Sequence, residues 1–310
     1  MRIVFMGTPD FAIPSLQRLV NSKHEVVGVV TSPDKPKGRG LRLSESPVKK
    51  FSEEHNLKIF TPENLKLDDF FYSLKELNPD LSVVVAFRIL PEKIFSLPPL
   101  GTINLHASLL PKYRGAAPIN WALINGETKT GLTTFYIQKK VDTGDLILQK
   151  EIDILPEETF GELHDRLATL GADFLFQTLD LIEKGEAKPT KQDHALASPA
   201  PKITREHGQI DWSKEATQIK NQIRGLSPIP AAFTLYKGKI LKIYKAKVIG
   251  ETSFSDGFGE VVESDNKEKI WAKTKEGILE ITELQPEGKR KMSAEEFVRG
   301  YRIKVGEKLG

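Results

Sequence analysis

Residues 2–30 read RIVFMGTPDFAIPSLQRLVNSKHEVVGVV, and the pattern of apolar residues in them indicates the class of fold. Residues 2–6 and 25–30 are apolar runs of the kind that form buried strands. Between them, residues 11–20 place apolar side chains at helical spacing. A buried strand, an amphipathic helix and a second buried strand together predict a βαβ unit.

The same alternation continues along the first half of the chain. Residues 65–77 have a helical pattern, and residues 81–86 (LSVVVA) and 102–106 (TINLH) follow as further strands. Residues 161–184 predict a long closing helix. This order is typical of an α/β fold with a doubly wound, mostly parallel, Rossmann-like sheet.

A change of pattern after residue 188 predicts the domain boundary. Residues 189–203 carry Pro189, Pro199 and Pro201 without an apolar period, which indicates an extended linker. Residues 213–226 predict a helix capped by Ser213. The short β-rich segments after it predict a small five-stranded barrel, and they are residues 233–236, 240–248, 260–263, 269–274 and 277–284. The predicted domains are therefore residues 1–188 and 204–310.

Composition narrows the class of protein. The chain has 310 residues, no cysteine and a net charge of +3, so disulfides, cysteine-ligated metals and cysteine nucleophiles are excluded. Residues 1–202 carry 25 Lys and Arg against 26 Asp and Glu, whereas residues 203–310 carry 20 against 16. The apolar run at residues 3–7 is too short for a signal peptide or a membrane span, so we expect a cytoplasmic protein.

Polar residues at the end of one strand indicate where the chemistry lies. Side chains alternate along a strand, so Asn104 and His106 share a face, while Ile103 and Leu105 point the other way. Ligands in open α/β sheets bind at the carboxyl ends of strands. From the spacing alone, a solvated polar face is an equally good interpretation.

Three motifs resemble those of the formyltetrahydrofolate-dependent formyltransferases. NLHASLLPKYRG at residues 104–115 matches the family pattern N-x-H-x-S-L-L-P-x-x-R-G. VDTGD at residues 141–145 resembles the D-T-G-D loop, and GTPDF at residues 7–11 resembles the G-T-P-x-F opening. Alone, D-T-G-D is more often an ordinary turn. The order and separation of the three motifs make the resemblance specific.

The resemblance implies that an amine attacks the formyl group of 10-formyltetrahydrofolate, and that Asn104, His106 and Asp142 are catalytic. The Asn104 amide would donate to the oxyanion of the tetrahedral intermediate. His106 would donate to the same oxygen or move protons, and Asp142, chosen over Asp145, would orient His106 and accept the amine proton. This chemistry needs no metal ion and no covalent nucleophile.

The resemblance also implies where the folate binds. The expected contacts are Ser108, Leu109, Leu110 and Pro111, together with Ile89 and Leu90. Relatives commonly read A-[FY]-G-x-I-L-P at the second segment, whereas residues 86–91 here read AFRILP, one residue shorter and without the glycine.

The C-terminal half suggests the acceptor. Residues 210–233 and 285–300 resemble the OB-like domain of the tRNA-acting members. This resemblance implies transfer of the formyl group to the α-amino group of methionine carried by initiator tRNA. We expect the protein to act as a monomer. A lysine-rich stretch with Tyr236 and Tyr244 suits a phosphate backbone, although a solvated edge has the same composition. The expected tRNA contacts are Lys35, Lys37, Arg39, Arg42, Lys237, Lys239, Lys242, Lys245 and Lys247.

Two other functions stay open at this point. One is a formyltransferase that acts on a nucleotide or sugar-nucleotide amine, which leaves the C-terminal domain unexplained. The other is a noncatalytic RNA-binding protein, which leaves Asn104, His106 and Asp142 without a role.

Overall fold

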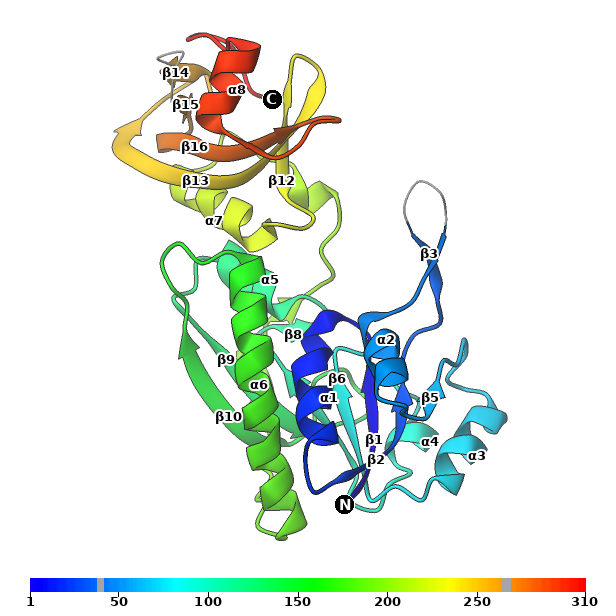
Figure 1. Ribbon diagram of the computed structural model, residues 1–310. Helices are drawn as coiled ribbons and strands as arrows, with labels where there is room; N and C mark the ends of the chain where they lie inside the picture. Colours follow the sequence, from blue (N-terminus) through cyan, green and yellow to red (C-terminus); the bar gives the residue numbers. More distant parts are fainter. Residues whose placement is uncertain (38–41, 264–268) are drawn as a thin grey trace. The chain divides into compact units, whose positions relative to one another are not determined.

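A seven-stranded sheet organises the first part of the chain in the computed structural model (Figure 1). β1 pairs in parallel with β2 and β6, and β6 with β7, whereas β7 and β9 are antiparallel. The predicted α/β fold with a mostly parallel sheet is therefore confirmed. Its strands lie in the order β10 (Leu146–Asp153), β9 (Lys129–Tyr136), β7 (Thr102–His106), β6 (Leu81–Val85), β1 (Arg2–Gly7), β2 (Glu25–Val30) and β5 (Ile59–Phe60).

Helix α6 (Phe160–Glu183) packs against one face of this sheet at β7 and β9. Gly171 permits the close approach, because a Cβ atom there would lie 2.9 Å from Cδ2 of Leu105. A buried hydrogen bond of 2.7 Å joins the hydroxyl groups of Thr134 and Thr178. Leu105 therefore faces α6, and the alternate residues of β7 face away from it.

Helices α3 (Asp68–Glu76) and α4 (Glu92–Phe95) cover the opposite face of the sheet. Val4 and Met6 of β1 belong to one buried cluster with Leu74 of α3 and Ile94 of α4. Helix α1 (Ile13–Val20) connects β1 to β2 in the chain. Helices therefore lie on both faces of the sheet, as the predicted doubly wound arrangement requires.

An antiparallel sheet forms the C-terminal part. Its strands are β12 (Ala232–Tyr236), β13 (Lys239–Ser253), β16 (Glu276–Pro286), β15 (Ile270–Lys273) and β14 (Val261–Glu263) in that order, with β17 (Met292–Ser293) beside β16. Helices α7 (Ala216–Leu226) and α8 (Ala294–Tyr301) bury apolar side chains in the same core as β13 and β16. This agrees with the expected small β domain.

Helix α7 starts three residues later than predicted. Its N-cap is Glu215, whose side chain forms a capping box with Gln218. The Ser213 hydroxyl instead donates to Oδ1 of Asp211 at 2.6 Å. The predicted cap at Ser213 is therefore wrong: Ser213 lies two residues before the N-cap, and its amide and hydroxyl both donate to Asp211 in a local turn.

The structure describes residues 1–37, 42–263 and 269–310, in two units. The first contains residues 1–115, 130–152 and 164–200, and the second contains residues 116–129, 153–163 and 201–310. This partition differs from the single boundary expected from the sequence, because helix α5 (Pro118–Ile124) packs with α7. The Asn120 amide donates a hydrogen bond to the Gly225 carbonyl at 2.8 Å. Within the described residues, no helix is long and apolar enough to cross a bilayer.

Short elements complete the chain. Within the first unit, β8 pairs in parallel with β11 near the end of the loop that follows β7, and β3 and β4 form a hairpin. The remaining short elements of both units are η1 (Asp10–Ala12), β3 (Lys35–Lys37), β4 (Arg42–Ser44), α2 (Pro47–Glu54), β8 (Arg114–Gly115), η2 (His194–Leu196), β11 (Pro199–Ala200) and η3 (Glu206–Gly208).

Candidate active site

Strand β7 carries two of the predicted catalytic residues, and at this strand the sheet changes from parallel to antiparallel pairing. Asn104 lies opposite Val84 of β6 and Phe135 of β9, so its backbone is held on both sides. Asn104 is half-buried, and His106 is only 6% exposed. Both point away from the α6 face, so the alternation brings them together as predicted.

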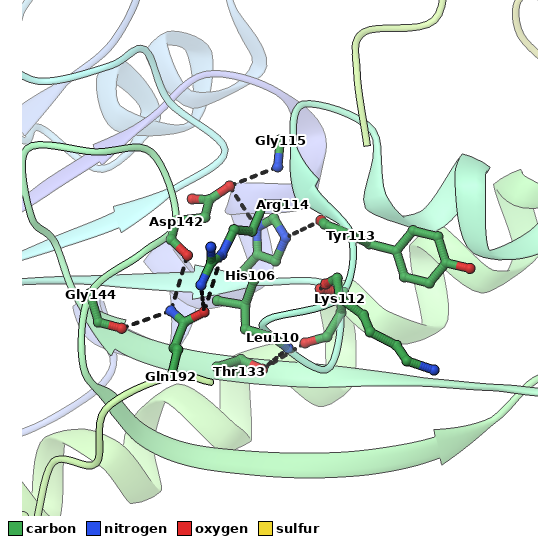
Figure 2. A network of polar contacts seen from close by, with 11 residues as sticks. His106, Leu110, Lys112, Tyr113, Arg114, Gly115, Thr133, Asp142, Gly144 and Gln192 are labelled. Carbon is green, nitrogen blue, oxygen red and sulfur yellow. Dashed lines mark hydrogen bonds and ion pairs between the residues drawn. The ribbon is translucent and has the colours of Figure 1, made fainter. Parts of the chain in front are cut away.

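The loop after β7 fixes the His106 ring. Nε2 of His106 lies 2.9 Å from the carbonyl oxygen of Tyr113, which adopts a left-handed conformation with φ 61° (Figure 2). A carbonyl oxygen only accepts, so Nε2 carries the proton and donates it. In the neutral ring, Nδ1 is then the basic nitrogen.

Asp142 presents its carboxylate to this basic nitrogen. Oδ2 of Asp142 accepts a hydrogen bond from the Gly115 amide at 2.8 Å and lies 3.9 Å from Nδ1 of His106. The second distance is too long for a direct hydrogen bond, so a water or an amine that contacts both groups can pass a proton between them. Protonation of Nδ1 would create an ion pair with Asp142.

The D-T-G-D loop has little freedom to move. Asp142 has φ 53°, and a Cβ atom at Gly144 would lie 1.6 Å from the carbonyl oxygen of Tyr136, so only glycine fits there. The backbone carbonyl of Asp145 accepts from the Tyr136 amide at 3.0 Å, which ties the end of the loop to β9. The carboxylate near His106 is that of Asp142.

Gln192 joins this site although the sequence placed it in a linker. Its Nε2 donates to the carbonyl oxygens of Asp142 at 3.0 Å and Gly144 at 2.7 Å (Figure 2). Its Oε1 accepts from Nη2 of Arg114 at 2.5 Å and from Nε at 3.2 Å. Gln192 is 6% exposed, and no local pattern singles out one glutamine in a polar, Pro-containing stretch.

Arg114 is held between Gln192 and His194. Its Nη2 donates to Nδ1 of His194 at 2.9 Å. Burial lowers the pKa of the Arg114 guanidinium, and the charge of Asp142 opposes that shift. The cation is therefore positioned beside the D-T-G-D loop by two side chains rather than left free in solvent.

The expected folate residues lie in two loops. Ser108 is fully buried and donates to the Lys112 carbonyl at 2.7 Å, and the Leu110 amide donates to Thr133 at 3.2 Å. Leu109 and Pro111 are half-buried in the same loop. In the second loop the Ile89 side chain is 74% exposed, whereas Leu90 is buried in the core beside α4.

Arg88 occupies the place where the sequence departs from the family pattern. Its Nη2 donates to the Pro62 carbonyl at 2.7 Å, and its Nη1 donates to the Glu63 carbonyl at 3.1 Å. The guanidinium also lies 5.3 Å from the centre of the Phe87 ring. These contacts tie the shortened loop to the segment after β5.

The expected tRNA residues form two groups. In the first unit, Lys35 and Lys37 lie on β3 and Arg42 on β4, and Lys37 pairs with Arg42 in the register, while Arg39 lies outside the described residues. In the second unit, Lys237 lies in the β12–β13 turn, and β13 carries Lys239, Lys242, Lys245 and Lys247.

The register adds acidic neighbours that the sequence did not show. Lys245 lies opposite Glu283 of β16, and Lys247 lies opposite Glu280. Lys237 forms an ion pair with Glu307 at 3.1 Å. The charge of Lys237 is therefore partly neutralised, whereas Glu283 forms its ion pair with Lys291 at 2.8 Å. Lys242 lies opposite Gln285, which carries no charge.

One group in the described residues has metal-ligand chemistry. His24, Asp180 and Glu183 offer ligand atoms within 4.8 Å of one another. However, Nζ of Lys23 already pairs with Glu183 at 2.5 Å and with Asp180 at 3.8 Å. An ammonium group thus already neutralises the carboxylates that a metal ion would need.

Comparisons with known proteins agree with this geometry. The model of the formyl transferase family matches residues 1–179, and that of the formyl transferase C-terminal domain matches residues 202–302. The methionyl-tRNA formyltransferase of Alkaliphilus oremlandii is 48% identical over 100% of both chains. The enzyme of the same name from Clostridioides difficile is 47% identical, again over 100% of both chains.

A solved structure shows the same fold at low identity. The sugar 3N-formyl transferase WlaRD, crystallised in the presence of dTDP and 5-N-formyl-THF, superimposes with a TM-score of 0.66 at 20% identity. The match covers 94% of this chain and 99% of that chain. At this identity the likeness supports the fold alone.

Proposed function

The chain belongs to the formyltransferase family, and on this premise we propose that it transfers the formyl group of 10-formyltetrahydrofolate to the α-amino group of methionyl-initiator tRNA. The observation that carries the proposal is the match, over the whole of both chains, to relatives named methionyl-tRNA formyltransferase at 47–48% identity. The match includes the C-terminal unit, whereas the sugar 3N-formyl transferase shares the fold over 94% of this chain at only 20% identity.

We assign the chemical step to Asn104, His106 and Asp142. The amine nitrogen of methionine attacks the formyl carbon, and the carbonyl oxygen becomes an oxyanion. The half-buried Asn104 amide on β7 is a preorganised donor to that oxygen, worth roughly 3 kcal/mol in comparable sites. The bond between the formyl carbon and N10 of the folate then breaks, which leaves tetrahydrofolate.

His106 and Asp142 handle the protons of this reaction. The attacking amine loses one proton, and Asp142 accepts it directly or through Nδ1 of His106, which lies 3.9 Å from the carboxylate. Once protonated at Nδ1, His106 is a donor that can stabilise the oxyanion or protonate N10 as it leaves. The hydrogen bond from Nε2 to the Tyr113 carbonyl keeps the ring in this orientation.

The donor is assigned to the loop at residues 108–111 and to the exposed Ile89 side chain. The loop follows the catalytic strand directly, and its backbone is fixed by the hydrogen bonds of Ser108 and Thr133. Leu90 contributes from the core beneath its loop. A folate analogue should therefore stabilise the protein against heat, because it binds the native state preferentially.

Charged tRNA is assigned to the β3–β4 hairpin with Arg39 and to the lysines of β13. Several cations along one polyanion are the usual source of tRNA affinity. We propose that the protein acts as a monomer. The reaction belongs in the cytoplasm, where charged tRNA is used.

The test is formyl transfer from 10-formyltetrahydrofolate, labelled in the formyl group, to a panel of acceptors. Methionyl-initiator tRNA should become labelled rapidly, and methionyl-elongator tRNA and a sugar-nucleotide amine should not. Preferred labelling of the sugar-nucleotide amine would replace the proposed acceptor. No labelling of any acceptor would remove the enzymatic assignment.

A further inference from the structure

A basic hollow of about 450 Å³ lies beside the D-T-G-D loop in the first unit. Its lining combines cations with neutral polar groups, and none of the described residues that line it is acidic. It is lined by Arg114, Gln138, Lys139, Lys140, Thr143 and His194. A concave surface of this composition attracts an anion.

The cation at the wall of the hollow belongs to a built arrangement. Arg114 is oriented by Gln192 and His194, and Gln192 is itself anchored to the Asp142 and Gly144 carbonyls. The Thr143 hydroxyl donates to the Lys140 carbonyl at 2.9 Å, which fixes the turn that carries the lysines. An anion bound here is therefore held at a set position relative to Asp142.

Resting on the proposed function, we propose that this hollow binds the terminal phosphate of the acceptor strand of the charged tRNA. The formylated amine and that phosphate are separated by one aminoacyl ester and one ribose, so the two lie near each other. Thr143 lines the hollow and follows Asp142, the residue assigned to accept the proton of the amine. A guanidinium offers a fork of donors that fits phosphate oxygens, and two lysines add charge.

The other anion in the reaction is the glutamate tail of the folate, and the placement of the loops favours the phosphate. Figure 2 shows Arg114 and Gln192 on the Asp142 side of His106, whereas Leu110 and Lys112 lie on the other side. The donor is assigned to the loop that contains Leu110. The hollow thus belongs to the acceptor side of the site.

The experiment compares two small acceptors that differ by one phosphate. They are adenosine and 5′-AMP, each esterified with methionine on the ribose, used as substrates or as inhibitors of the tRNA reaction. The wild-type protein should prefer the phosphorylated acceptor on the order of tenfold, as expected for a charge-assisted contact. The exposed pair variant Lys139→Ala/Lys140→Ala should lose most of this preference.

Two further variants sharpen the result. Arg114→Lys keeps the charge but loses the fork, so it should lower the preference while leaving the apparent KM for 10-formyltetrahydrofolate unchanged. Lys66→Ala/Lys75→Ala removes the same charge from exposed positions elsewhere in the first unit and should keep the wild-type preference. With full-length charged tRNA, the Lys139/Lys140 pair variant should reduce the logarithmic salt slope by roughly 1.

Two outcomes would overturn the assignment of the hollow and leave the proposed function intact. If the pair variant lowers kcat/KM equally for both small acceptors, the hollow does not bind the terminal phosphate. If it raises the KM for polyglutamylated folate and spares the phosphate preference, the hollow belongs to the folate tail. In both cases the wild-type protein would still formylate methionyl-tRNA.

Discussion

The carboxylate of Asp142 has two separable roles at the residue scale. It accepts a hydrogen bond from the Gly115 amide, and it faces Nδ1 of His106. Asp142→Asn keeps an oxygen for the first role, and asparagine tolerates the left-handed φ of 53°. We expect kcat to fall on the order of 10²–10⁴-fold with little change in stability, because only the proton acceptor is removed.

The measurement for this prediction is kcat against pH for Asp142→Asn, with Asp145→Asn as the matched control in the same loop. The pH dependence should change in the first variant, since the asparagine side chain does not ionise and cannot accept the proton, and should persist in the second. The reverse pattern would move the catalytic role to Asp145.

At the residue scale, the strand period and the motifs predict which side chains lie together, and the catalytic roles of these residues stay predictions. Asn104 and His106 share a face because side chains alternate along β7, and the structure places Asp142 next to His106. Gln192 was missed, because its importance comes from contacts with residues about 50 and 78 positions away in the chain. Periodicity and turn chemistry carry no information about such contacts.

At the scale of elements, the start of α6 shows how a helix is stabilised locally. The Thr159 amide and hydroxyl both donate to Oε2 of Glu162, at 2.8 and 2.7 Å, which forms a capping box. These hydrogen bonds, from the backbone first and the side chain second, lower the pKa of Glu162 below its usual 4.5. A lowered pKa means that the cap stabilises the fold above pH 4.5 and that this stabilisation is lost as the pH falls through the folded pKa.

Thr159→Ala should therefore lower the free energy of unfolding by about 1 kcal/mol at neutral pH and by less in acid. Urea midpoints at the two pH values test this. Thr169→Ala is the control, because Thr169 is exposed within α6, and its hydroxyl only bonds back to Asp165. An equal loss of stability in both variants, or a loss independent of pH, would contradict the capping role of Thr159.

Among the elements, β1, β2 and β6 are predictable because they are continuous apolar runs, and β7 is predicted as the next strand in the alternation, whereas the short strands β3, β4 and β5 are not predicted. Strands β9 and β10 were not identified. β9 buries Thr133 and Thr134, whose hydroxyls are satisfied by Ser108 and Thr178 far away in the chain. β8 and β11 fall in segments that the sequence predicts to be a loop and a linker, because each has two residues and is defined only by the other.

At the scale of the whole molecule, the charge is uneven, with an excess of four positive charges in residues 203–310 and one negative charge in residues 1–202. Lys242→Ala/Lys245→Ala should raise the KM for charged tRNA and reduce the logarithmic salt slope by roughly 1 for each phosphate that is no longer neutralised. Because Glu283 lies opposite Lys245, we expect Lys242 to account for the larger share. The KM for the folate should not change.

Steady-state kinetics at several salt concentrations provide the measurement for this pair. Lys214→Ala/Lys304→Ala removes the same charge from exposed positions of the same unit and is the control. An equal effect in both pairs would show that net charge alone, and not the β13 ribbon, governs tRNA affinity.

We propose that Asn104 and His106 act on the tetrahedral transition state and not on substrate binding. The most direct test is the single-turnover rate of formyl transfer in Asn104→Ala and His106→Ala, with both substrates saturating, beside the equilibrium affinity of each variant for charged tRNA. We expect the rate to fall on the order of 10²–10³-fold in Asn104→Ala, with a comparable loss in His106→Ala, while the affinity stays within about threefold of the wild type. A near-normal single-turnover rate in either variant, or a defect that appears only as weaker tRNA binding, would contradict this claim.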